Sequence, residues 1–305
     1  MNTTHPTHAG GIWFARLLPS FAVALVASFA LSASIASAQT LLTNPADVTW
    51  FKSRTGDSIT PGATNVLFVE GQTSGSSFIM NFPTANVAVG ETLTVSLSFT
   101  TGGTVNNTTS NSFRFGVFNN GGTPITANFN SNSPGASEFT NDFGYMFQHN
   151  FNGASSLGMY ARDAGTGTMP NTLLSTTASP GWLNIASDTT GTPAPVAAST
   201  FYTLTLSLAR IDGGYTFSSL LNGGATSEYA RTVTDTTSGS IGLASFNSFA
   251  FYINGGSNAM SAIDLSAMNI SVAATVIPEP STYAALVGLC ALGLVAYRRR
   301  FAARA

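Results

Sequence analysis

A strict alternation of apolar and hydroxyl-bearing residues constrains this chain most. In residues 91–100 every second position from Leu93 to Phe99 is apolar, and the positions between them are Thr or Ser. Residues 201–211 repeat the pattern. Successive side chains of a strand point to opposite faces, whereas a helix would scatter these apolar residues around its axis. The alternation predicts strands with one face in a core and the other in solvent.

Similar short apolar segments recur along the chain and are separated by Gly, Asn and Asp turns such as 212–214. The further strands expected lie at 65–70, 76–82, 112–119, 142–149, 157–162, 182–185, 215–221, 229–234, 246–253 and 263–272. No fixed-period repeat of the solenoid or propeller kind occurs. We therefore predict an all-β domain over residues 39–274, built as a two-sheet antiparallel jelly-roll sandwich.

The last part of the chain, residues 275–305, has a different character. It contains the tripeptide Pro278, Glu279 and Pro280, then an apolar run, then Arg298, Arg299 and Arg300. The prolines hold the tripeptide extended and accessible to an enzyme. We predict a transmembrane helix at about 281–297 that the arginines stop on the cytoplasmic side. Because the apolar run alone is shorter than a usual span of about 20 residues, a buried core helix is the alternative.

This order of tripeptide, apolar helix and terminal arginines resembles the PEP-CTERM sorting domain of exported proteins of Gram-negative bacteria. The resemblance covers only the end of the chain. It implies an exosortase as partner, an intermediate held in the inner membrane by the helix, and a final place on the cell surface or in the extracellular matrix. A permanent inner-membrane anchor that is never cut is the alternative.

The N-terminus carries a second sorting signal, over residues 1–38. An apolar run at 17–35 precedes a small-x-small cleavage site formed by Ala36 and Ala38, so that Gln39 would begin the mature chain. Signal peptidase and the export machinery are then expected partners. An uncleaved membrane anchor is the alternative.

Composition limits the function of the body. Only 8% of the residues are charged and the net charge is -2. Since four of the arginines belong to the tail, the body itself is acidic, which argues against nucleic acid as a partner. Low charge and abundant Thr, Ser, Asn and Gly suit a surface or matrix protein that contacts extracellular polysaccharide.

We find no constellation of catalytic residues. The body has no cysteine, because Cys290 lies in the tail, and its one histidine is His149. No Gly-x-Ser-x-Gly segment presents a nucleophile. The carboxylates are scattered, although Glu138 and Asp142 could form a pair in the fold. We therefore predict a protein that is not an enzyme, with a glycan-cleaving enzyme as the alternative.

A cofactor is not expected, and one histidine without a cysteine argues against a zinc site. Calcium is a possibility, because loop aspartates such as Asp163, Asp188 and Asp212 supply hard oxygen ligands. No EF-hand or nonapeptide spacing supports it.

The order of strands from 91 to 272 resembles the concanavalin A-like, or laminin G-like, sandwiches. The points of similarity are the alternating strand at 91–100, the segment 113–118, the hairpin strand at 202–211 and the terminal strand at 264–270. Members of that superfamily bind or cleave glycans. Sugar rings stack on exposed aromatic faces, so we name Trp182, Trp50 and Tyr145 as candidate ligand contacts, with Trp182 the best candidate for an exposed ring.

Overall fold

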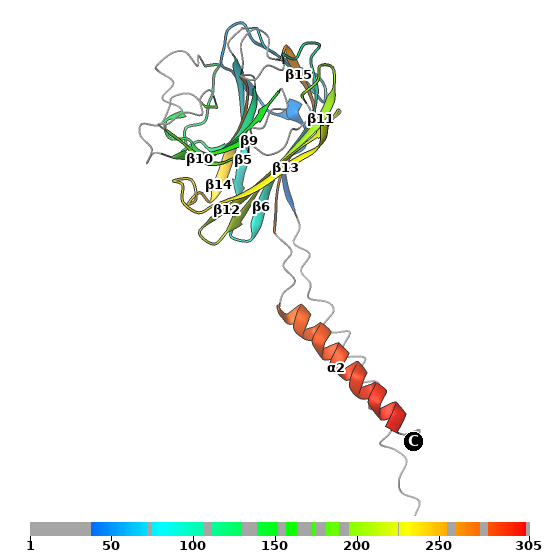
Figure 1. Ribbon diagram of the computed structural model, residues 1–305. Helices are drawn as coiled ribbons and strands as arrows, with labels where there is room; N and C mark the ends of the chain where they lie inside the picture. The colour runs from blue at the N-terminus through cyan, green and yellow to red at the C-terminus, as the bar shows by residue number, and fades with distance from the viewer. Residues whose placement is uncertain are drawn as a thin grey trace, which may run out of the picture. The chain divides into compact units, whose positions relative to one another are not determined.

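The computed structural model describes residues 38–71, 75–106, 112–129, 139–151, 157–163, 173–174, 181–188, 195–224, 226–254, 260–274 and 280–302. Internal contacts separate a body, Ser37–Thr275, from a unit that contains the C-terminal segment from Val276 onward. The body consists of two packed antiparallel sheets (Figure 1). This arrangement confirms the predicted all-β sandwich.

The larger sheet, sheet A, has eight strands. In spatial order these are β13 (Thr226–Asp235), β12 (Gly214–Gly223), β11 (Phe201–Ile211), β6 (Glu91–Thr101), β15 (Ala262–Ala274), β4 (Val66–Val69) and β3 (Ser58–Pro61), and β1 (Gln39–Leu42) also pairs with β15. The two longest alternating segments of the sequence, β6 and β11, pair along nine consecutive positions from Phe201↔Thr100 to Ala209↔Thr92. They form the centre of this sheet.

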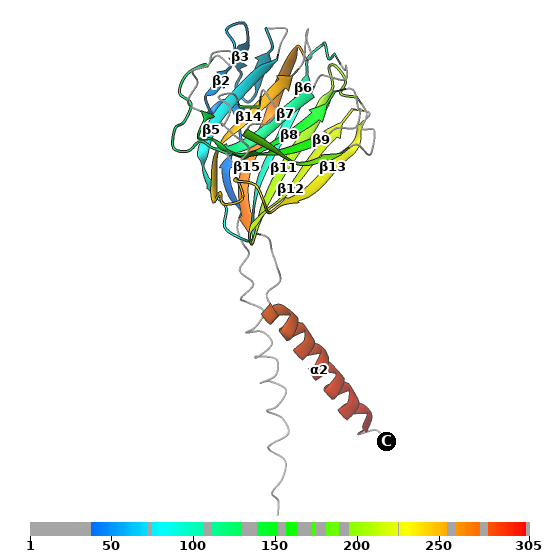
Figure 2. The same ribbon diagram turned by 60° about the vertical axis from the view of Figure 1, so that its left-hand side comes forward.

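The second sheet, sheet B, has seven strands. Their spatial order is β10 (Gly181–Asp188), β9 (Leu157–Asp163), β8 (Phe143–Asn150), β7 (Ser112–Asn119), β14 (Ser245–Asn254), β5 (Ser76–Asn86) and β2 (Trp50–Lys52). Figure 2 shows β5, β14, β7, β8 and β9 side by side in this order. A short 3-10 helix, η1 (Pro45–Asp47), precedes β2, and the helix α2 (Pro280–Ala302) belongs to the C-terminal unit.

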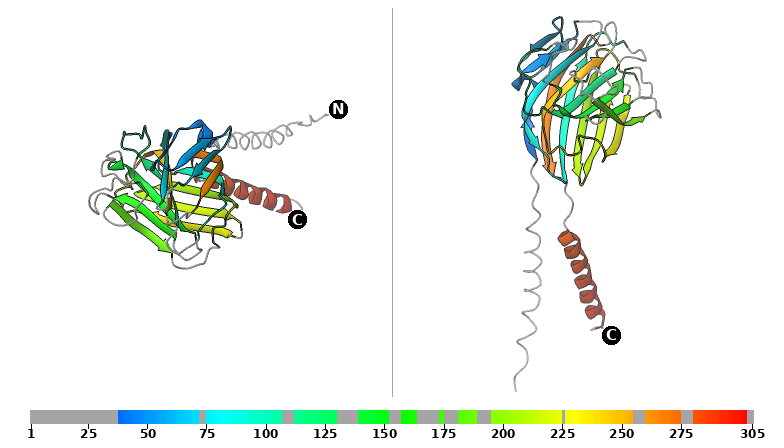
Figure 3. Two further views of the ribbon diagram at one scale, coloured as in Figure 1. Left: turned by 90° about the horizontal axis from the view of Figure 1, so that it is seen from above. Right: turned by 90° about the vertical axis from the view of Figure 1, so that its left-hand side faces the viewer.

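The main core lies between the two sheets, whose strands are seen from two further sides in Figure 3. It is rich in aromatic rings: Phe115 of β7 stacks on Phe147 of β8 at 5.5 Å, and Tyr145 reaches Phe217 of the opposite sheet at 4.1 Å between ring centroids. Full burial of each such side chain contributes about 1.5–3 kcal/mol. Because the body has no disulfide, this packing is its main source of stability.

One bulge keeps the alternation of β15 in phase with the core. Its pairing with β6 shifts between Leu265 and Ala267, which leaves Ser266 as an extra, exposed residue. Leu265 before the bulge and Met268 after it therefore both face the core, although they are three positions apart.

The outward faces of the two sheets differ. A second apolar cluster covers the outer face of sheet B, where Ile125, Phe139, Leu173 and Leu174 from connecting segments pack on strand residues such as Met146. The outer face of sheet A is half-exposed to exposed along β6, β11 and β12, at every second residue. Sheet A thus presents an open strand surface to solvent, whereas the second apolar cluster covers much of the outer face of sheet B.

Candidate functional site

The C-terminal segment forms the expected helix, α2, which begins at Pro280 and ends at Ala302. Proline suits the first position of a helix, because that position needs no N–H donor. Within the described ranges no helix combines the length and the apolarity needed to cross a membrane.

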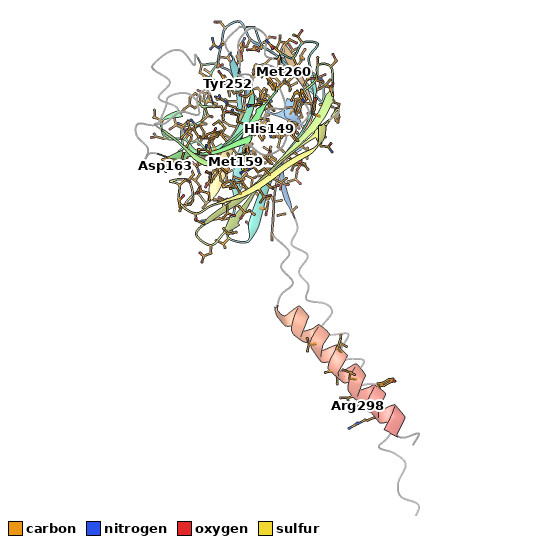
Figure 4. All side chains as sticks on the ribbon, in the orientation of Figure 1. His149, Met159, Asp163, Tyr252, Met260 and Arg298 are labelled. Carbon is orange, nitrogen blue, oxygen red and sulfur yellow. The ribbon has the colours of Figure 1, made fainter. Side chains whose placement is uncertain are left out.

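The residues that define the tail signal are described only in part. Pro278 and Glu279 lie outside the described residues, whereas Arg298 and Arg299 are exposed, and Figure 4 labels Arg298. Arg300 belongs to the helix. The side chains of 281–286, where the predicted span begins, are also outside the described part, so the span at about 281–297 stays a prediction.

The predicted N-terminal cleavage site adjoins the first strand of the body. Ala36 lies outside the described residues, Ala38 is exposed, and Gln39 is the first residue of β1. β1 pairs with the end of β15, with Gln39 opposite Val272 and Thr40 opposite Ser271. Cleavage after Ala38 would leave β1 whole, and both ends of the body then leave it at the same end of sheet A.

The three aromatic candidates are all buried, and the expectation that Trp182 is exposed is wrong. Its ring lies on the covered face of sheet B, 2% exposed, with the Arg162 guanidinium 5.3 Å from the ring centroid. Trp50 packs on Phe68 and donates from Nε1 to the carbonyl oxygen of Pro45 at 3.0 Å. Tyr145 lies between the sheets. Trp182 lies next to a turn, which suggested exposure. Its ring is buried because a connecting segment covers the strand that carries it.

The predicted pairing of Glu138 with Asp142 stays a prediction, because Glu138 lies outside the described residues. Asp142 is buried beside Arg162, and burial raises the pKa of its carboxyl to about 7, although the guanidinium opposes this shift. His149 is also buried, stacked on Phe115 and 3.2 Å from the hydroxyl of Ser219. Burial lowers the pKa of its imidazole to about 3.

The three aspartates considered as calcium ligands do not converge in the described structure. Asp163 ends β9, Asp212 is exposed in the turn between β11 and β12, and the side chain of Asp188 is not described. Among the residues that the structure describes, no three or more His, Cys, Asp or Glu side chains are placed to hold a metal ion.

Two buried carboxyl groups, Asp57 and Glu70, are not among the residues predicted from the sequence. Oδ1 of Asp57 accepts hydrogen bonds from the Ser76 hydroxyl at 2.8 Å and from the amide of Gly71 at 3.2 Å. Oε1 of Glu70 accepts one from the amide of Gly75 at 3.1 Å. The second oxygen of each carboxyl group is buried and has no hydrogen-bond partner among the described residues.

Burial is the main cause of the raised pKa values of this pair. It raises the pKa of Asp57, and it raises that of Glu70 to about 7, with the nearby Asp57 charge adding to the shift. Val66, Phe68 and Glu70 are buried at alternate positions, but the unbroken apolar run 66–69 does not show in the sequence which face is inward. Asp57 comes from a turn, where no periodic signal exists.

A buried polar network fills part of the outer face of sheet B. Arg114 of β7 donates from Nε to Gln148 at 3.0 Å and from a terminal nitrogen to the carbonyl oxygen of Leu174 at 2.9 Å. Its guanidinium lies 5.5 Å from the ring centroid of Tyr252. Because Arg114 is only 6% exposed, this network holds a connecting segment on the sheet and is closed to a ligand from solvent.

The open face of sheet A carries a regular array of hydroxyl groups. The strand registers place one hydroxyl residue of each of six neighbouring strands in a single row, which consists of Thr232, Ser218, Ser207, Thr94, Ser271 and Thr40. Three further rows run beside it on the same face: Thr234, Thr216, Ala209, Thr92 and Ala273; then Leu220, Thr205, Ser96 and Asn269; then Asn222, Thr203, Ser98 and Ala267. We call these four rows the hydroxyl face. None of its residues carries a charge.

Comparison with known proteins gives a clear result for the tail. Residues 276–300 match the family model of the PEP-CTERM protein-sorting motif. A search of curated protein sequences finds no match.

Solved structures similar to the body include several lectins and lectin-like proteins. Peanut lectin is 8% identical, with 78% of this chain and 98% of that chain covered and a TM-score of 0.42. A lectin from Bauhinia forficata in complex with GalNAc is 7% identical, with 79% and 99% covered and a TM-score of 0.44. Arcelin-5, a lectin-like defense protein from Phaseolus vulgaris, is 6% identical, with 78% and 99% covered and a TM-score of 0.45.

The motif predicted from Pro278, Glu279, Pro280 and the terminal arginines is thus confirmed, and the chain is an exported protein that carries a PEP-CTERM protein-sorting motif at its C-terminus.

Proposed function

We propose that this protein is a non-catalytic component of the extracellular matrix or cell surface of a Gram-negative bacterium. Signal peptidase removes residues 1–38, α2 holds the chain in the inner membrane, and an exosortase then cuts at Pro278, Glu279 and Pro280. The body, released from its helix, stays with extracellular polysaccharide. The observation that carries this proposal is the match of residues 276–300 to the sorting motif, since it includes the tripeptide, the helix and the arginines in order.

The described carboxyl groups with raised pKa values do not favour the enzyme alternative. A glycosidase brings two carboxyl groups to opposite sides of a bound sugar. Asp57, Glu70 and Asp142 are 2%, 7% and 2% exposed. Side chains this deeply enclosed support a role in packing, and we keep the non-catalytic module as the proposal.

Intact mass spectrometry of the protein from its own host tests the sorting steps. Protein from the extracellular fraction should begin at Gln39 and end near Pro280, and replacement of Pro278, Glu279 and Pro280 by alanine should leave the full-length tail in the membrane fraction. Replacement of the exposed Pro83 by alanine is the control, because it removes a proline from the body alone. An uncut tail in every fraction of the natural protein would make α2 a permanent anchor.

A further inference from the structure

We propose that the hydroxyl face of sheet A binds straight, uncharged polysaccharide chains, which lie along its central row from Thr232 to Thr40. This inference rests on the proposed function, because it assumes that the exported body meets such polymers. It names the surface and the class of ligand, which the sorting motif does not.

The first support is the geometry of the central row. Each of its six residues comes from a different strand, and every neighbouring pair is a direct partner in the registers of sheet A. Neighbouring strands are about 4.8 Å apart, so the row extends over about 24 Å. A surface of this length can contact several successive rings of an extended polymer, whereas a compact monosaccharide would use only a small part of it.

The second support is the chemistry of the face. The four rows of the hydroxyl face carry no charged residue, and the adjoining row of Phe201 and Thr100 carries one acidic residue, Asp264, and no cation. Serine and threonine hydroxyls both donate and accept hydrogen bonds, as sugar hydroxyls do. An acidic polymer would find no cation here, so the face fits an uncharged partner.

The third support is that the hydroxyl groups of the row are not used inside the protein. Throughout the described ranges, none of the six central residues makes a side-chain hydrogen bond. In the neighbouring row, by contrast, Thr216 and Thr234 bond to each other at 3.1 Å. The central hydroxyls are therefore available to a ligand without breaking internal bonds.

An exposed aromatic ring lies beside this array. Phe201, at the start of β11, is 53% exposed, and it pairs with Thr100 of β6 one row beyond Thr203 and Ser98. Aromatic rings offer an apolar surface to the apolar face of a sugar ring. Phe201 thus offers the exposed aromatic ring that was expected at Trp182.

The test uses the processed protein, from Gln39 to the tripeptide, in pull-down assays with microcrystalline cellulose and chitin as uncharged probes and with alginate as an acidic probe. The double variant Thr94→Val, Ser207→Ala removes two adjacent central hydroxyls and keeps residues that a strand tolerates. We expect it to weaken binding to an uncharged probe by about tenfold, as the loss of two hydrogen bonds would. Phe201→Ala should weaken it as well.

The matched control is Thr236→Val, which removes an exposed hydroxyl from the connection between β13 and β14, outside the hydroxyl face. It should bind as the natural sequence does, and thermal melts should show that all variants are folded. Binding to neither cellulose nor chitin, preference for alginate, or equal binding by the double variant would overturn the proposal. So would self-association that the double variant abolishes, since the face would then be an interface between copies of this chain.

Failure of this inference can be told apart from failure of the proposed function. The double variant keeps its sorting motif, so its intact mass should show normal cleavage at both ends even when it no longer binds. Normal processing without polysaccharide binding would reject only the role of the hydroxyl face. Binding by a protein whose tail is never cut would reject only the sorting steps.

Discussion

The buried pair of Asp57 and Glu70 makes the stability of the body depend on pH in an unusual direction. The pKa of Glu70 is raised from 4.5 to about 7, chiefly by burial and further by the Asp57 charge. Between these two pKa values the folded state binds more protons than the unfolded state, so stability falls as pH rises. The stabilisation is fully present below about pH 4.5 and is lost above about pH 7.

The substitution Glu70→Gln isolates this effect. Glutamine keeps a carbonyl oxygen for the amide of Gly75 but does not ionise. A shift of this size corresponds to about 3 kcal/mol of stability. Above about pH 7 the variant should therefore be more stable than the natural sequence by up to about 3 kcal/mol, which raises the melting temperature by roughly 6–12 °C for a domain of this size.

Thermal melts followed by circular dichroism, from acid to alkaline pH, measure the difference between the variant and the natural sequence. Asp142 has a raised pKa too, but it contributes equally to both proteins and leaves the difference unchanged. Asp212→Asn, at an exposed turn, is the control and should follow the natural profile. A variant whose stability relative to the natural sequence does not change with pH would refute the reasoning.

Three further outcomes are expected. The imidazole NMR signal of His149, the one histidine after residue 38, should keep a constant chemical shift down to about pH 5, because burial lowers the pKa of the imidazole to about 3. A titration midpoint of this signal near neutral pH would contradict the burial of His149. Gly144→Ala should cost more than about 2 kcal/mol in urea unfolding, because Gly144 has a φ of 153° and a Cβ would overlap the carbonyl of Val117. Gly242→Ala is the control for the added methyl group, because no atom lies within 4 Å of its Cβ position and its φ is not in the left-handed region. Trp50→Phe should cost about 1–3 kcal/mol, because it leaves the carbonyl of Pro45 without its donor, and an unchanged unfolding midpoint would argue against that bond.

Much of the candidate chemistry could not have been read from the sequence. Trp182 follows Pro180 and Gly181, a context typical of an exposed turn, yet its ring is covered where Leu174 and Phe118 of the same apolar cluster pack. Asp57 and Glu70 are thirteen positions apart and meet only because a turn and the end of β4 come together in the fold. Covering and pairing of this kind depend on contacts between distant segments, and local patterns carry no information about them.

The alternation of apolar and hydroxyl residues by itself determined that residues 91–100 and 201–211 are strands with one polar face, and the order of tripeptide, apolar run and arginines determined the sorting motif. These are local properties, because a strand repeats every two residues and the motif is contiguous. Only the tertiary structure decided that β6 lies between β11 and β15, and that six strands align their hydroxyls in one row. Each strand specifies which of its faces is polar, but its partner and register follow from how all the inward faces pack into a single core.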